Sequence, residues 1–157
     1  MKKRLFRLFS LLWAVAMLSA CGKDPELELF RKNINDFCTK ISEIDTSINN
    51  IDAEAANAPD ELLAYLDDLD IVFQSFARLD FPEEFNYLEN LADESSQFMT
   101  EAVEGFHQAY SNKSYDPTAA EYAQQSYNKA YKRIQIIITF LHGEEPQDVD
   151  LSVEYNR

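Results

Sequence analysis

The sequence is poor in the residues on which many small catalytic and cofactor sites depend. Its 157 residues contain three glycines, two cysteines and two histidines. The glycines stand far apart, so there is no glycine-rich phosphate-binding loop, and the cysteines do not form a Cys-x-x-Cys pair. A nucleophile elbow of the Gly-x-Ser-x-Gly type is also missing. Because no catalytic constellation is recognisable, we expect neither an enzyme nor a cofactor.

Basic residues are also scarce. The chain has 14 Lys and Arg against 28 Asp and Glu, which gives a formal net charge of −14. An acidic surface repels nucleic acid and anionic lipid headgroups, so we expect no nucleic-acid partner. Positively charged partners or cations would be attracted.

The first 20 residues have the composition of a secretory signal peptide. Four basic residues precede an apolar run from Leu8 to Leu18, and the small residues Ser19 and Ala20 follow it. The run is about half of the roughly 20 residues that a membrane-spanning helix needs. We therefore expect residues 1–20 to be removed as a signal peptide.

The four residues Leu18-Ser19-Ala20-Cys21 resemble the lipobox of bacterial lipoproteins. The resemblance implies that the Cys21 sulfur carries a diacylglycerol, that cleavage makes Cys21 the first residue, and that the protein is anchored on the extracytoplasmic face of a membrane. Gly22, rather than Asp, follows the cysteine, which leaves an outer membrane and a Gram-positive surface both open. The alternative is an ordinary cleaved signal with an incidental cysteine.

Removal of residues 1–20 would leave 137 residues, enough for one domain with a real core. Four of the 14 basic residues and none of the acidic ones would be lost, so the formal charge would become −18. Residues 21–24 would form a short lipidated tether. Cys38 would then have no cysteine to pair with, and we expect a buried structural thiol beside Phe37.

Apolar residues recur at alternating spacings of three and four, which predicts helices. The first helix opens at Asp24-Pro25, where an N-cap residue precedes a proline. The second is expected from about Asp60 to Leu79, after a turn at 52–59. The apolar seam of the first is Leu27, Phe30, Ile34, Phe37, Ile41, Ile44, Ile48 and Ile51, and that of the second is Leu62, Leu66, Leu69, Phe73 and Phe76.

Two further helices follow the same spacing. The third is expected to open at Pro82, and the fourth at Asp116-Pro117 after a loop at 111–114, ending near Gly143 and Pro146. The seam of the third is Phe85, Leu88, Ala92, Ser95, Met99, Ala102, Phe106 and Ala109, and that of the fourth is Ala120, Ala123, Tyr127, Ala130, Ile134, Ile137 and Leu141.

Four amphipathic helices with short connections predict an all-α fold, an antiparallel up-down four-helix bundle over residues 25–142. A three-helix arrangement is the fallback if the break at Pro82 is only a kink. We expect residues 143–157 to be a disordered tail. The alternative is that this tail docks on the bundle through its alternating apolar residues Val149, Leu151, Val153 and Tyr155.

The candidate binding surface is a group of tyrosines on the third and fourth helices, at the end that would lie farthest from the membrane anchor. Tyrosine combines a large contact area with a polar tip and is enriched at recognition surfaces. The alternative is that the rings only cover a narrow, alanine-lined core. The candidate partner-binding residues are Tyr110, Tyr115, Tyr122, Tyr127 and Tyr131.

The metal-ligand signal is weak. Glu104 and His107 have the Glu-x-x-His spacing of carboxylate-bridged bundles, but those need two such motifs and this chain has one. The acidic run Asp67-Asp68-Leu69-Asp70 has no calcium-binding loop around it, so we expect a solvent-facing surface. Gly105 inside a helix indicates a close approach or a slight bend.

Two functions remain open. The first is a lipid-anchored, non-catalytic interaction or structural module whose tyrosine-rich end binds an envelope protein or other envelope component. The second is a lipoprotein that binds a small ligand or metal through His107 and neighbouring carboxylates.

Overall fold

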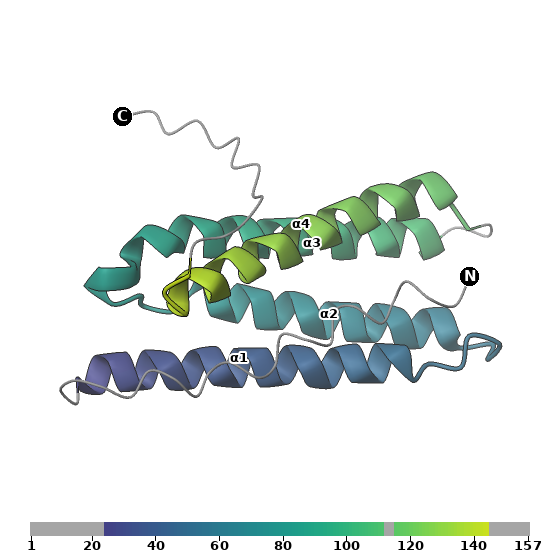
Figure 1. Cartoon of the computed structure of the whole chain (residues 1–157). Helices are drawn as coiled ribbons and strands as arrows, with labels where there is room; N and C mark the ends of the chain where they lie inside the picture. The colour runs from purple at the N-terminus through teal and green to yellow at the C-terminus, as the bar shows by residue number, and fades with distance from the viewer. Residues whose placement is uncertain (1–23, 112–114, 145–157) are drawn as a thin grey trace.

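The computed structural model describes residues 24–111 and 115–144. The expected signal peptide, the lipidation site Cys21, residues 112–114 of the third loop, and the tail from residue 145 lie outside these ranges. Every element within them is a helix, and the four α-helices run in alternating directions (Figure 1). The elements are α1 Pro25–Asn49, α2 Ala58–Ala77, the 3₁₀ helix η3 Glu83–Leu88, α3 Glu89–Ser111 and α4 Pro117–Leu141.

Helices α1 and α2 form one layer and helices α3 and α4 form the other, and each helix packs on the next in the chain (Figure 1). The prediction of an all-α, up-down four-helix bundle is therefore confirmed, and the three-helix fallback is wrong. The N-terminus of α1, η3 and the C-terminus of α4 share one end. We name the opposite end, which holds the junction of α3 and α4, the distal end.

Local capping explains where two of the helices begin. A side-chain oxygen of Asp24 accepts the backbone N–H of Glu26 at 3.0 Å, and Asp116 accepts those of Thr118 and Ala119 at 2.9 and 3.1 Å. A proline follows each Asp, where its missing N–H costs no hydrogen bond. Both predicted helix starts, at Pro25 and Pro117, are confirmed.

Helix α2 begins two residues earlier than expected. Pro59 was placed in the preceding turn, but it lies in the first turn of α2, where proline is tolerated because those N–H groups have no intrahelical acceptor. The C-terminal limit, Ala77, falls two residues before the expected Leu79. The turn between α1 and α2 is correspondingly shorter than predicted.

The prediction of one continuous third helix from Pro82 is wrong for its first turns. Residues 83–88 form η3, and α3 proper begins at Glu89. Aromatic packing explains the difference. The buried Phe81 ring lies 4.9 Å from Phe30 and 5.9 Å from Phe76, and the tight η3 turn brings Phe85 to 5.8 Å from Phe30, measured between ring centroids.

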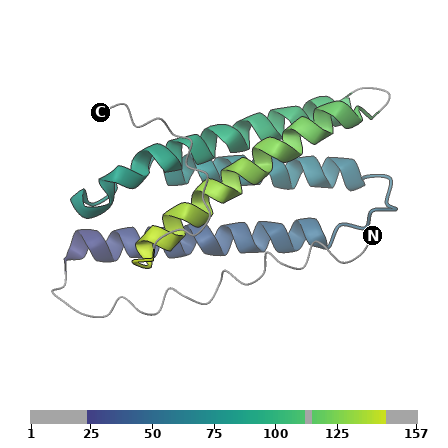
Figure 2. The same ribbon diagram turned by 45° about the horizontal axis from the view of Figure 1, so that its top comes forward.

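The large core residues lie mainly toward the end that holds Pro25. Phe37 stacks on Phe76 with ring centroids 4.1 Å apart and meets Phe73 edge-on at 5.6 Å. Helix α4 crosses the bundle obliquely, so that its C-terminal half approaches α1 (Figure 2). It adds Ile134, Ile137 and Leu141 to the same core.

The distal half of the α3–α4 contact is lined instead by small residues. Ala102, Ala109, Ala120 and Ala123 are all buried there. A Cβ at Gly105 would lie 2.9 Å from the Cβ of Ala123, which is closer than two such atoms can pack. Backbone contact is accordingly most extensive between α3 and α4, and the close approach expected at Gly105 is confirmed.

The middle of the same contact is fixed by a buried serine. Ser95 on α3 is fully buried, and its hydroxyl donates to the carbonyl oxygen of Ala130 on α4 at 3.0 Å. This hydrogen bond satisfies a polar group that would otherwise be unpaired in the core. None of the helices in the described ranges has the length and apolarity needed to cross a membrane.

We predict that Gly105→Ala lowers the free energy of unfolding by up to about 2 kcal/mol. Overpacking in a tight contact typically costs about 1–3 kcal/mol, and the better helix propensity of alanine returns about 1 kcal/mol at most. Because the Ala123 Cβ is fixed to its backbone, the helices themselves must separate. Urea unfolding measures the change.

The double variant Gly105→Ala with Ala123→Gly should show a favourable coupling energy, since it removes the facing methyl group. If Gly105→Ala alone raises stability by the amount that helix propensity predicts, the close approach of α3 and α4 at this point is refuted.

Candidate functional site at the distal end

Three of the five candidate tyrosines lie toward the distal end, and two of them, Tyr110 and Tyr115, are in contact. Tyr115 is 54% exposed and Tyr122 is 67% exposed, whereas Tyr110 is half-buried. The rings of Tyr110 and Tyr115 are tilted against each other with centroids 5.2 Å apart. The backbone N–H of Asp116 donates to the carbonyl oxygen of Ala109 at 3.0 Å, which holds the start of α4 against the end of α3.

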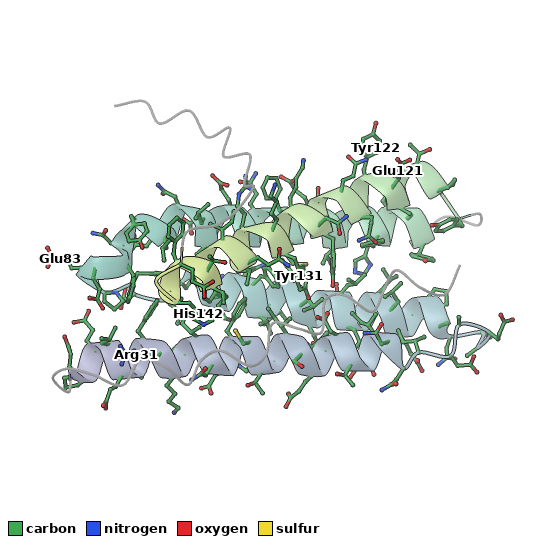
Figure 3. The ribbon with its side chains drawn as sticks, in the orientation of Figure 1. Arg31, Glu83, Glu121, Tyr122, Tyr131 and His142 are labelled. Atoms are coloured by element: carbon green, nitrogen blue, oxygen red, sulfur yellow. The ribbon has the colours of Figure 1, made fainter. Side chains whose placement is uncertain are left out.

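The other two tyrosines lie elsewhere, and the expectation of one five-membered surface is wrong. Tyr131 lies near the middle of α4 (Figure 3). It and Tyr127 are half-buried, and their rings stack with centroids 4.7 Å apart. Their hydroxyls point to α1 and donate to the same oxygen of Asp45, at 3.4 and 2.9 Å. The phenol groups therefore join α4 to α1.

Burial alters the acidity of this cluster. It raises the pKa of the Asp45 carboxyl above the ordinary value of 3.8, and the hydrogen bonds from Tyr131 and Tyr127 oppose that shift only in part. Burial, reinforced by the neighbouring carboxylate, also raises the pKa of both tyrosines. At neutral pH the hydroxyls therefore keep their protons and act as donors.

We predict that Asp45→Asn changes how stability depends on pH. Because the folded-state pKa of Asp45 is raised, the contribution of this group to stability falls as the pH rises from 3.8 through the raised pKa. The Asn amide oxygen can still accept both hydroxyls and carries no charge. The unfolding free energy of Asp45→Asn, relative to that of the native chain, should therefore increase as the pH rises through this range. Above the raised pKa the difference should become constant.

The matched control is Asp36→Asn, which removes an exposed carboxylate from the same helix without touching the tyrosines. An equal pH-dependent difference in this control, or a shift of opposite sign in Asp45→Asn, would contradict the assignment.

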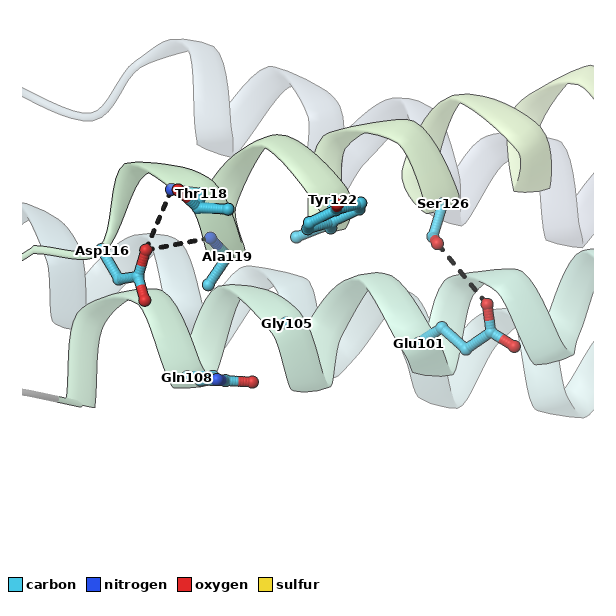
Figure 4. A pocket seen from close by; sticks show the side chains of 9 residues that line it. Glu101, Gly105, Gln108, Asp116, Thr118, Ala119, Tyr122 and Ser126 are labelled. Atoms are coloured by element: carbon cyan, nitrogen blue, oxygen red, sulfur yellow. Dashed lines mark hydrogen bonds between the residues drawn. The ribbon is translucent and has the colours of Figure 1, made fainter.

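A groove of about 300 Å³ runs along the outer side of the α3–α4 contact at the distal end (Figure 4). Its small residues, Gly105, Ala119 and Ala123, come from the two facing helices. Tyr122 from α4 lines it as well. The remaining lining residues are Glu101 and Gln108 from α3, and Asp116, Thr118 and Ser126 at or beyond the start of α4.

The carboxylates of the groove are positioned by neighbouring donors. One oxygen of Glu101 accepts the Ser126 hydroxyl at 3.5 Å across the helix contact, and the other accepts the Gln97 amide at 3.1 Å. Asp116 accepts the two backbone N–H groups of its capping interaction. Its negative charge lies where the α4 dipole is positive.

Sequence reasoning missed Glu101, Gln108 and Ser126. A helical spacing does connect these residues in the sequence. On α3, Glu101, Gly105 and Gln108 are separated by four and three residues, and on α4, Ala119, Tyr122 and Ser126 are separated by three and four. These rows flank the apolar seams. A prediction based on the apolar seams alone therefore does not include these groove residues.

The weak metal-ligand candidates do not form a cluster. Nε2 of His107 lies 2.7 Å from an oxygen of Asp67 on α2, and both side chains are about half exposed, at 46% and 52%. Glu104 is exposed on α3. Within residues 24–111 and 115–144, no three His, Cys, Asp or Glu side chains are grouped so that they could hold a metal ion.

The acidic run on α2 is not simply a solvent-facing surface. Besides the Asp67–His107 contact, Asp70 accepts the hydroxyl of Thr100 on α3 at 2.6 Å. Only Asp68 of the three is exposed without a described contact to α3. Asp67 and Asp68 are exposed as expected, and the expectation is wrong only for Asp70, which is half-buried because its position flanks the α2–α3 contact.

Cys38 is half-buried and packs against the hydrophobic core, and burial raises the pKa of its thiol. A raised thiol pKa disfavours the reactive thiolate. This environment agrees with a structural thiol.

Comparison with protein families, with curated proteins and with solved structures finds no match to this chain. The function must therefore be argued from the site itself.

Proposed function

We propose that this protein is a lipid-anchored extracytoplasmic module without catalytic activity, which binds a partner through the distal end of α3 and α4. The observation that carries the proposal is that Tyr115 and Tyr122 are largely exposed at the distal end, where Tyr122 lines a groove and Tyr115 packs against Tyr110. Such amphipathic rings give contact area at low conformational cost.

The direction of the chain supports the same proposal. The lipobox ends at Cys21, and α1 begins at Pro25, so a tether of a few residues would hold the near end of α1 to the membrane. Because α1 runs from that end toward the distal end, the tyrosines would face away from the membrane (Figure 1). The acidic charge would oppose contact with anionic headgroups.

The proposal is tested by cross-linking in intact cells, capture of the protein, and identification of its partners by mass spectrometry. We expect one dominant protein partner with the native chain. Replacement of Tyr110, Tyr115 and Tyr122 by Ser should abolish capture while circular dichroism shows an intact helical fold. Cys21→Ala should release the protein from the membrane and reduce capture.

Tyr87→Ser is the matched control, since Tyr87 is 48% exposed but lies in η3 at the opposite end. Capture that survives the triple substitution with the fold intact would place the binding surface elsewhere. A thermal midpoint that rises when Zn²⁺ is added, and returns with a chelator, would instead favour the metal-binding alternative through His107.

A further inference from the structure

We infer that the groove between α3 and α4 binds a lysine or arginine side chain from an extended basic segment of a partner protein. The inference rests on the proposed function, because it identifies the chemistry that the distal end would recognise. The groove residues that would make the contact are Tyr122 and Glu101.

The charged side chains beside the groove are acidic, and Lys129, one turn of α4 beyond Ser126, lies over the ring of Phe98, with its Nζ 5.2 Å from the ring centroid. Residues 97–111 and 115–126 contain four carboxylates, Glu101, Glu104, Asp116 and Glu121, and no Lys or Arg. Lys113 lies between these ranges, outside the described residues. An unbalanced set of carboxylates attracts a cation and raises its association rate.

Glu101 and Tyr122 offer two complementary contacts for such a cation. The exposed Glu101 carboxylate is contacted from both helices, by the Gln97 amide at 3.1 Å and the Ser126 hydroxyl at 3.5 Å. Tyr122, which is 67% exposed, supplies a ring face for a cation–π contact. The small residues Gly105 and Ala123 also line the groove, and neither projects a long side chain into it.

The size of the groove agrees with a single side chain. Pockets that enclose small molecules measure about 300–1,000 Å³ and bury most of the ligand. This groove, of about 300 Å³ and open to solvent, is at the lower limit. A long basic side chain can extend along it while the remainder of its segment lies on the surface of α3 and α4.

Charge also decides among the possible occupants. A second copy of the chain would bring another strongly acidic surface, and an anionic headgroup would be repelled in the same way. A basic protein segment has the required charge and also the apolar stem that packs on tyrosine.

The test is isothermal titration of the full-length protein, purified from membranes in a non-ionic detergent, with a synthetic peptide of alternating Lys and Ser. We expect binding that weakens as salt is added. Tyr122→Ala and Glu101→Gln should each weaken binding about two- to fivefold, which is the range of one exposed cation contact. The double variant should lose about tenfold.

Glu83→Gln and Tyr87→Ala are the matched controls, because they remove the same groups from η3 at the opposite end (Figure 3). The inference is overturned if the peptide does not bind, if these controls weaken binding as much as the groove variants, or if spermine binds as tightly as the peptide. A cellular partner whose capture needs the tyrosines would uphold the proposed function even then, so the two failures are distinguishable.

Discussion

The close approach of α3 and α4 is the constraint on which the remainder of the structure depends. Where Gly105 faces Ala123 there is no space for another methyl group, so both helices must carry small residues along this contact. Small residues let the backbones meet but bury little apolar area each. The α3–α4 pair therefore needs the rings of α1 and α2 to complete a core of adequate size, and Phe37 and Phe73 supply them.

This difference between the two halves of the bundle explains why the tyrosines at the distal end lie on its surface. A narrow interior lined by alanine cannot accept a phenol ring, so Tyr115 and Tyr122 have no place in the core. Toward its middle, α4 comes closer to α1, and Tyr127 and Tyr131 fill the space between the two helices with their hydroxyls on Asp45. The geometry accounts for the position of each ring, and binding of a partner would account for the choice of tyrosine at the exposed positions.

Local signals predicted most of the fold. The three-four spacing located every α-helix because each buries one face, and Asp24 and Asp116 marked two helix starts because a cap acts within three residues. The 3₁₀ turn of η3 could not be predicted, since it depends on Phe81 meeting α1 across the bundle. For the same reason, spacing along α4 could not separate exposed Tyr122 from Tyr131, whose acceptor lies 86 residues away.

Arg133 on α4 pairs with Glu94 on α3, but other carboxylates take part in helix contacts without being neutralised. Carboxylates on α1 and α2 accept hydrogen bonds across helix contacts, Asp45 from Tyr131 and Asp70 from Thr100. Hydroxyl donors satisfy a carboxylate but leave its charge in place, unlike Lys or Arg. The bundle thus gains cross-helix hydrogen bonds while keeping a strong negative field. A domain of this kind at the end of a lipid tether would stand away from an anionic membrane and attract a basic partner to its exposed end.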